Sequence, residues 1–230
     1  MMHAAKALGM TMIDIFKDKK LREEIKKEFD EKQIESSGIY YLDEKKKKYI
    51  DRFRNRIIFP VKNLNNSVLA LGGRAVSKTA FAKYINSPET EFYKKGNNLF
   101  NMNEARKVRE KNDQIFVVEG YMDAIRAHKH GYSNVVASMG TALTSYQVDQ
   151  IKVMAENVIM ALDSDAAGQQ ATIRNLDSSW KVFQNGAVAK RNSRDILRSS
   201  KNPVIKIASM PNGEDPDDVI NRSTEEWDKL

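Results

Sequence analysis

The chain has 230 residues, of which 41% are hydrophobic and 30% are charged, and it contains no cysteine. A chain of this size and composition folds around a sizeable core, and without cysteine it has no disulfide framework, thiolate zinc site or iron–sulfur cluster. Its apolar stretches are shorter than the roughly 20 residues that a membrane helix needs, and residues 1–12 lack the pattern of a secretory leader. We therefore expect a cytoplasmic protein that has no membrane partner.

The charge is unevenly distributed along the chain. Residues 1–110 carry 24 Lys and Arg against 15 Asp and Glu, a net charge of +9, whereas residues 111–230 carry 14 against 16, a net charge of −2. A basic half followed by a mildly acidic half suits a protein that binds a polyanion with the first and divalent cations with the second. Because basic proteins are common, the asymmetry alone does not identify nucleic acid as the partner.

The basic half, residues 1–110, is predicted to form a mixed α+β subdomain. The four consecutive lysines at 45–48 suit an exposed turn between two strands. The two glycines at 72–73 suit the end of a hairpin, because glycine pairs commonly mark turns. The predicted elements are, in chain order, a charged helix at 19–33, strands at 39–42 and 49–53, a hairpin over 57–61 and 68–71, an extended segment at 83–88 and a helix at 101–110.

The second half, residues 111–230, alternates between apolar strands and helices. The predicted strands cover 115–118, 134–137, 158–162 and 204–208, and the predicted helices cover 121–130, 144–156 and a segment that begins at Asp165. Strands that are apolar along their length and separated by helices predict a parallel sheet covered on both faces. The predicted fold class is therefore α/β, with the basic mixed subdomain followed by a parallel sheet of about four strands flanked by helices. Ligands bind at the carboxyl ends of the strands in such sheets.

Carboxylates follow three of the four predicted parallel strands. They are Glu119 and Asp123 after the first strand, Asp163 and Asp165 after the third, and Asp215, Asp217 and Asp218 after the fourth. Carboxylates gathered at one edge repel one another, and Mg²⁺ relieves this repulsion because it takes oxygen ligands and bridges carboxylates to phosphates. Two such ions about 4 Å apart hold the attacking and leaving oxygens of a phosphoryl displacement. The arrangement predicts Mg²⁺-dependent phosphoryl or nucleotidyl transfer.

A structural explanation is also open for some of these side chains. Aspartate favours helix N-termini, where it caps the first turn and faces the positive end of the helix dipole. This alternative applies to Asp123, Asp217 and Asp218, each of which is expected near the start of a helix.

Six strings of residues carry a resemblance to a known family. They are, in chain order, Arg52–Pro60, Gly72–Arg74, Lys83–Thr90, Glu119–Asp123, Ala137–Thr144 and Gly213–Asp217. In this order they resemble the RNA-polymerase core of bacterial DNA primases, which carries the TOPRIM signature that primases share with topoisomerases. The resemblance runs from about residue 34 to residue 220. Six strings in register are far more specific than a single Glu-Gly or Asp-X-Asp.

The resemblance implies a DNA-directed RNA polymerase that synthesises short RNA primers on single-stranded DNA during replication. It implies Mg²⁺ or Mn²⁺ as cofactor, with no zinc in this chain, because the family's zinc ribbon needs Cys ligands and this chain has none. The implied partners are a single-stranded DNA template, ribonucleoside triphosphates and, in the full-length family, the replicative helicase, whose binding domain we do not expect in this chain. The implied location is the nucleoid, at the replication fork.

The resemblance also implies roles for individual residues. Glu119 would be a metal ligand or the general base on the attacking 3′-hydroxyl group. The other residues that would bind metal are Asp163, Asp165, Asp215 and, as a further ligand, Asp217, with Asp123 in support. The residues that match the basic groove for nucleotide and template are Arg52, Arg74, Lys83 and Lys95, with Tyr84 and Asn86 beside them. Arginine offers a bidentate fork to phosphate and lysine a point charge, which suits this assignment. The alternative role for Tyr84 is packing.

Other interpretations fit part of the pattern. A TOPRIM nuclease would share the carboxylates, whereas a topoisomerase needs a nucleophilic tyrosine on a separate domain that we do not expect after this sheet. A dehalogenase-type phosphatase would share Asp163 and Asp165 but wants Thr or Val where this chain has Ala167. A non-catalytic single-strand-binding or assembly module is the remaining alternative. The long connection Ser178–Pro203, with six Lys and Arg against one Asp, is a rival DNA-binding site.

Overall fold

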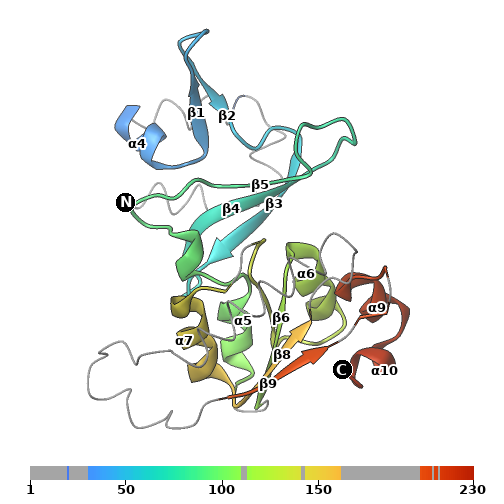
Figure 1. Ribbon diagram of the computed structural model, residues 1–230. Helices are drawn as coiled ribbons and strands as arrows, with labels where there is room; N and C mark the ends of the chain where they lie inside the picture. Colours follow the sequence, from blue (N-terminus) through green and yellow to red (C-terminus); the bar gives the residue numbers. More distant parts are fainter. Residues whose placement is uncertain are drawn as a thin grey trace, which may run out of the picture. The chain divides into compact units, whose positions relative to one another are not determined.

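The computed structural model in Figure 1 groups the chain into two compact units, which are described separately. The described residues are 20, 31–109, 113–140, 143–161, 203–208, 210–211 and 213–230. The first unit contains Met1–Lys62 and Ser67–Lys94, and the second contains Asn63–Asn66 and Lys95–Leu230. Within the described residues, every helix is too short or too polar to span a lipid bilayer.

The described part of the first unit begins with a short helix and a two-stranded antiparallel sheet. These elements are α4 (Glu31–Ser36), β1 (Tyr40–Asp43) and β2 (Lys48–Asp51). The exposed turn between the strands carries Lys45 to Lys47, whereas Lys48, which was predicted in the same turn, begins β2. Asp43 accepts hydrogen bonds there from the backbone N–H groups of Lys45 and Lys46. The helix predicted at 19–33 lies almost entirely outside the described residues.

A three-stranded antiparallel sheet follows in the same unit. Its strands, in the order β3-β4-β5, are β3 (Arg56–Lys62), β4 (Val68–Ala75) and β5 (Tyr84–Asn86). The predicted hairpin is confirmed, but the prediction that Gly72 and Gly73 end it is wrong, because β4 continues through both glycines. A Cβ atom at Gly73 would lie 2.8 Å from Cδ1 of the buried Phe53. Glycine therefore serves close packing inside a strand here.

The second unit is built on a four-stranded sheet in the order β7-β6-β8-β9. Its strands are β6 (Gln114–Val118), β7 (Val135–Ala137), β8 (Asn157–Ala161) and β9 (Val204–Ala208). All three neighbouring pairs are parallel. The predicted parallel sheet is confirmed, and with the antiparallel sheets of the first unit so is the predicted fold class.

Helices flank this sheet. They are the 3-10 helix η1 (Lys95–Asn97), α5 (Met102–Lys107), α6 (Tyr121–Lys129), α7 (Ser145–Met154), α9 (Pro216–Arg222) and α10 (Thr224–Trp227). The helices predicted at 121–130 and 144–156 correspond to α6 and α7, and α6 ends where Gly131 takes a φ of +95°. The observed α5 is shorter than the helix predicted at 101–110. The helix predicted from Asp165 lies outside the described residues.

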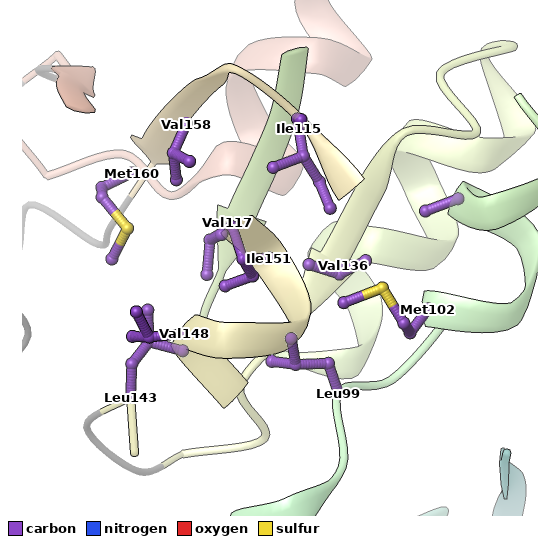
Figure 2. Close-up of a cluster of buried hydrophobic side chains, with 12 residues drawn as sticks. Leu99, Met102, Ile115, Val117, Val136, Leu143, Val148, Ile151, Val158 and Met160 are labelled. Carbon is purple, nitrogen blue, oxygen red and sulfur yellow. The ribbon is translucent and has the colours of Figure 1, made fainter. Parts of the chain in front are cut away.

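The two faces of the parallel sheet are covered by different helices, with α5 and α7 on one side and α6, α9 and α10 on the other (Figure 1). Alternate residues of a strand face opposite sides. On β6, Ile115 and Val117 belong to a buried cluster with Ile151 of α7 (Figure 2). Phe116, which lies between these two residues in the sequence, faces the other side, and its ring centroid lies 5.0 Å from that of the buried Trp227 of α10. The predicted covering of both faces is confirmed.

Candidate functional site

Glu119 directly follows β6, at the carboxyl end of the parallel sheet. The next residue, Gly120, starts α6, and its backbone N–H donates a 2.9 Å hydrogen bond to Oδ2 of Asp123. Asp123 is 7% exposed, and a Cβ atom at Gly120 would lie 2.9 Å from the same oxygen. Asp123 thus makes the helix-capping contact that the sequence left open as an alternative. This contact fixes the turn that carries Glu119.

Asp215 lies at the N-terminus of α9. Its Oδ1 accepts a 2.8 Å hydrogen bond from the backbone N–H of Asp218, and Oδ2 of Asp218 accepts one of 3.4 Å from the N–H of Asp215. Partial burial raises the pKa of the Asp215 carboxyl, and the charges of Asp218 and Asp217 raise it too, while the hydrogen bond from Asp218 lowers it. A bound cation would offset the burial and the repulsion, because it favours the charged carboxylate.

Asp217 has an arginine partner that the sequence analysis missed. Nε of Arg126 lies 2.5 Å from Oδ1 of Asp217, and the two side chains are 28% and 22% exposed. The hydrogen bond and the charge of Asp217 raise the pKa of the Arg126 guanidinium. Arg126 lies on α6, so the pair ties α9 to the helix that starts beside Glu119. A cation bound at Asp217 would compete with Arg126.

The donor chemistry of these carboxylates suits a hard divalent cation. Glu119 and Asp215 offer carboxylate oxygens, the ligand type that Mg²⁺ and Mn²⁺ prefer. In the part of the chain that the structure describes, no three His, Asp or Glu side chains come together as ligands of one ion. Asp163 and Asp165, which the sequence analysis assigned to the same site, lie outside that part. A site built on Glu119 and Asp215 therefore needs further ligands.

Four of the predicted nucleic-acid-binding residues lie on β4, on β5 or directly before β5. Arg74 and Tyr84 are paired across the two strands, so their side chains lie on the same face of the sheet. The guanidinium carbon of Arg74 lies 5.8 Å from the centroid of the Tyr84 ring, and Nζ of Lys83 lies 5.9 Å from it. Asn86, two residues further along β5, is on the same face as Tyr84. A cation–π contact stabilises a cation without neutralising it, so this face keeps its positive charge for an anionic ligand.

Two further arginines of the first unit lie near these strands in sequence. The guanidinium carbon of Arg52 lies 5.7 Å from the centroid of the Tyr41 ring. Nη1 of Arg56 donates hydrogen bonds of 3.4 Å to the carbonyl oxygens of Gly73 and Lys83. The sequence analysis gave Arg56 no role, although Arg56 belongs to one of the six strings. Its contacts link β3 to the backbone of Lys83 and so support the Tyr84 face.

Lys95 belongs to the second unit, whereas the five other residues of the predicted groove belong to the first. It lies in η1 and is half-buried. Burial lowers the pKa of its ammonium group, because desolvation disfavours the charged form. An anion bound at Lys95 would act in the opposite direction and favour the charge.

Comparison with known proteins matches both halves of the chain. Residues 11–106 match the family described as the DNA primase catalytic core, N-terminal domain, and residues 113–191 match the Toprim domain. The DNA primase of Clostridium acetobutylicum is 40% identical to this chain over 200 residues, which cover 87% of this chain and 30% of that protein.

Solved structures give the same result. A DNA primase domain from Pseudomonas aeruginosa has a TM-score of 0.70 and 31% identity, covering 84% of this chain and 55% of that one. A DnaG primase catalytic domain bound to single-stranded DNA has a TM-score of 0.70 and 28% identity, covering 86% and 56%. The parallel sheet, whose strand β6 is followed by Glu119, thus belongs to a Toprim domain. The chain is a member of the bacterial DNA primase family, within its catalytic core, and spans 30% of the length of the curated relative described above.

Proposed function

We propose that this chain is the catalytic part of a primase, which joins ribonucleotides into short RNA primers on single-stranded DNA with Mg²⁺ or Mn²⁺. The observation that carries the proposal is the presence, in one chain of the primase family, of two kinds of surface. One is the basic strand face at Arg74 and Tyr84, and the other is the set of carboxylates at Glu119 and Asp215. Toprim proteins of the primase family generally use a divalent metal.

We assign the metal-binding role to Glu119, Asp163, Asp165, Asp215 and Asp217. A bound Mg²⁺ or Mn²⁺ would supply charge stabilisation for the phosphoryl group that is transferred. In the reaction, the 3′-hydroxyl oxygen of the primer bonds to the α-phosphorus of a ribonucleoside triphosphate. The bond from that phosphorus to the bridging oxygen breaks, and pyrophosphate leaves. Glu119 acts as a ligand or as the general base that accepts the hydroxyl proton.

Two side chains are proposed to hold the carboxylates in place. Asp123 accepts the hydrogen bond from Gly120 and so fixes the turn that carries Glu119. Arg126 holds Asp217 by its ion pair and so fixes the start of α9. Neither side chain needs to touch the substrate for this role.

The basic residues are proposed to bind the template and the nucleotide. Arg74 and Lys83 would contact phosphate groups, since the Tyr84 ring stabilises both cations and leaves them charged. The other residues proposed to bind the template or the nucleotide are Arg52, Tyr84, Asn86 and Lys95. The relative solved with single-stranded DNA supports this kind of ligand.

We propose that residues 1–110 act as the basic subdomain and residues 111–230 as the metal-binding catalytic domain. The family matches at 11–106 and 113–191 support this division. The activity would take place in the cytoplasm, at the replication fork. The replicative helicase stays a predicted partner of the full-length family, and we assign it no residue of this chain.

Primer extension tests the proposal directly. The chain is incubated with a single-stranded DNA template and labelled ribonucleoside triphosphates, with and without Mg²⁺ or Mn²⁺. We expect labelled RNA only with metal, and none from Glu119→Gln. Synthesis that is equal without metal, or equal in Glu119→Gln, would contradict the assignment.

The alternative of a non-catalytic single-strand-binding module has one observation in its favour. Asp123, Asp215 and Asp217 each have a protein partner, as expected for carboxylates that serve only the fold. The same assay separates the two functions. A chain that binds single-stranded DNA but makes no RNA under any metal condition would favour the binding module.

A further inference from the structure

The start of α7 holds the backbone of η1 through side-chain hydrogen bonds. Oγ1 of Thr144 donates to the carbonyl oxygen of Gly96 at 2.5 Å. Nε2 of Gln147 donates to the carbonyl oxygens of Asn98 at 2.7 Å and Lys95 at 3.4 Å. These carbonyls belong to residues 95–98, which form η1 and the residue after it and are called the turn below. The remaining carbonyl of the turn, that of Asn97, accepts a 2.8 Å hydrogen bond from Nε2 of Gln150. Side chains of α7 and its cap therefore occupy four consecutive backbone carbonyls.

Both polar atoms of the Gln147 side chain take part in this contact. Its side chain is fully buried. Its Oε1 accepts a 3.0 Å hydrogen bond from the backbone N–H of Thr144, and Oγ1 of Thr144 accepts one of 3.2 Å from the N–H of Gln147. Both polar atoms of the buried amide thus have partners, which such a group requires. Leaving any of them without a partner would be costly, so these hydrogen bonds oppose a displacement of the turn.

The turn lies directly against Thr144. A Cβ atom at Gly96 would lie 3.0 Å from Cγ2 of Thr144, tighter than an ordinary contact. The turn itself has no buried residue, and its Asn98 N–H bonds back to the carbonyl of Lys95 at 3.2 Å. The residues of the turn are therefore not held by burial of their own side chains, and the nearest buried anchor is Leu99, which follows the turn. The hydrogen bonds from α7 hold the backbone of the turn directly.

The sheet anchors α7 independently of these contacts. Val148 and Ile151 of α7 are fully buried in the apolar cluster with Val117 and Val158 (Figure 2). The polar side chains at the start of α7 are therefore not needed to dock the helix. What they add is a fixed backbone for Lys95.

We propose that Thr144 and Gln147 are positioning residues, which hold the backbone of Lys95 so that its ammonium group meets a phosphate group of the nucleic acid or of the nucleotide. This inference rests on the proposed function, because Lys95 is one of the residues proposed to bind the template or the nucleotide. Holding the turn before the ligand arrives removes most of the ordering cost that a mobile loop would add to binding. Burial lowers the pKa of the Lys95 ammonium group, and a bound phosphate group would favour its charged form. Thr144 is the last residue of one of the six strings of the resemblance, and the proposal gives this residue a role.

The test compares Thr144→Val, which removes the hydroxyl but keeps the shape, with Thr144→Ser, which keeps the hydroxyl. Gln150→Ala is a second variant. Because the Gln150 side chain is half-exposed, its removal should leave the core folded. Each is made with Lys95 intact and in the Lys95→Ala background. Ser223→Ala is the matched control, because Ser223 caps α10 through the N–H of Glu226 and has no contact with the turn among the described residues.

Two binding measurements distinguish the sources of phosphate. One is the affinity for a single-stranded oligonucleotide over a series of salt concentrations, and the other is the affinity for ATP with Mg²⁺. With Lys95 intact, we expect Thr144→Val to weaken the binding of one of the two ligands several-fold. If that ligand is DNA, the logarithmic salt slope flattens by about 0.7, one phosphate contact. In the Lys95→Ala background the same change should have no further effect, and Thr144→Ser should restore wild-type affinity.

Three results would overturn the inference. They are an effect of Thr144→Val that persists in the Lys95→Ala background, an effect of Ser223→Ala on affinity as large as that of Thr144→Val, and wild-type affinity for both ligands in Lys95→Ala. The last result leaves the proposed function standing if Arg74→Ala still weakens DNA binding. A wild-type chain that binds neither DNA nor ATP would instead contradict the proposed function itself.

Discussion

The two units hold their candidate functional side chains in opposite ways. In the first unit, Arg74 and Lys83 lie over the ring of Tyr84, and a ring contact leaves a cation charged. In the second unit, Asp123 and Asp215 accept hydrogen bonds from backbone N–H groups at helix starts. Such a bond favours the charged form of the carboxylate. Cations and carboxylates are thus both held in place by contacts that favour their charged forms.

The units also differ in what surrounds these side chains. In the first unit, all three residues of β5, which carries part of the basic face, are only half-buried, whereas β6 of the second unit is buried along almost its whole length. Changes to the basic face should therefore alter binding while leaving the fold stable. Changes to the second unit should affect the fold wherever they reach the sheet or its covering helices.

The largest effect on stability is expected for Trp227→Ala. Trp227 is fully buried against Phe116, and its removal should lower the free energy of unfolding by about 3–5 kcal/mol. Trp227→Phe should cost much less, because the ring contact stays and the buried indole N–H has no hydrogen-bond partner among the described residues. Phe92→Ala in the first unit is the control, since Phe92 is 74% exposed and the change should stay within about 0.5 kcal/mol. Urea unfolding measures all three.

The next largest effect is expected for Glu119→Gln in primer extension. Loss of a metal ligand or general base should slow synthesis about a hundredfold or more, while the melting temperature stays close to that of the wild type. Arg74→Ala sharpens the comparison between the units. It should weaken binding but leave the rate at saturating template nearly unchanged, and the reverse pattern would exchange the two roles.

A smaller effect is expected for Mg²⁺ on thermal unfolding. Binding to the folded state alone stabilises it by about 2.7 kcal/mol at a metal concentration one hundred times the Kd. Arg126→Gln removes the cation that competes for Asp217 and should enlarge the Mg²⁺-dependent rise in Tm. Lys129→Gln, on the exposed surface of the same helix, is the control. Equal Mg²⁺ responses in the two variants would mean that Asp217 takes no part in the site.

Single-stranded DNA binding should show a modest, uniform effect of the basic face. Arg74→Ala should weaken binding to all sequences alike and flatten the logarithmic salt slope by about 0.7. Lys45→Ala, in the exposed turn between β1 and β2, should change the slope less. Wild-type affinity and slope in Arg74→Ala combined with Lys83→Ala would move attention to the basic connection at 178–203.

The smallest effect is expected for the pH dependence that comes from His128. Burial lowers the pKa of His128, although the hydrogen bond to the carbonyl of Val135 and the charge of Glu104 act in the opposite direction. The unfolded chain, with a histidine pKa near 6.5, therefore binds the proton first as the pH falls. Stability should decrease below about pH 6.5. Tm is measured above and below that pH. The decrease in Tm at the lower pH should be smaller for His128→Gln than for the wild type, whereas His130→Gln, at an exposed histidine, should leave the decrease unchanged.

The strands and helices of the second unit were predictable because their signals are local. Apolar runs of four or five residues, separated by helical segments, determine both the strands and their parallel pairing. The role of Gly73 was not predictable, since it depends on Phe53, which lies on a separate element. The sequence shows that a glycine is present but not which side chain approaches it.

The candidate residues were predictable only as types and positions. The resemblance gave Glu119 and Asp215, but the partner of Asp217 is 91 residues away, and no spacing rule connects them. The four carbonyl contacts of α7 were equally hidden, because backbone oxygens carry no sequence signature. What escaped prediction in each case was a contact between distant segments.

The position of β9 at the edge of the parallel sheet has a consequence for folding order. Strands β6, β7 and β8 follow one another within residues 114–161, whereas β9 pairs with β8 only after the chain closes over residues 162–203. Closure entropy rises only slowly with loop length, by about 0.6 kcal/mol per doubling, so the long connection weakens the native state little. Its cost falls on the rate, because such pairing must wait for a distant segment. The three-stranded part should therefore form first, with β9 and the helices that follow it docking last.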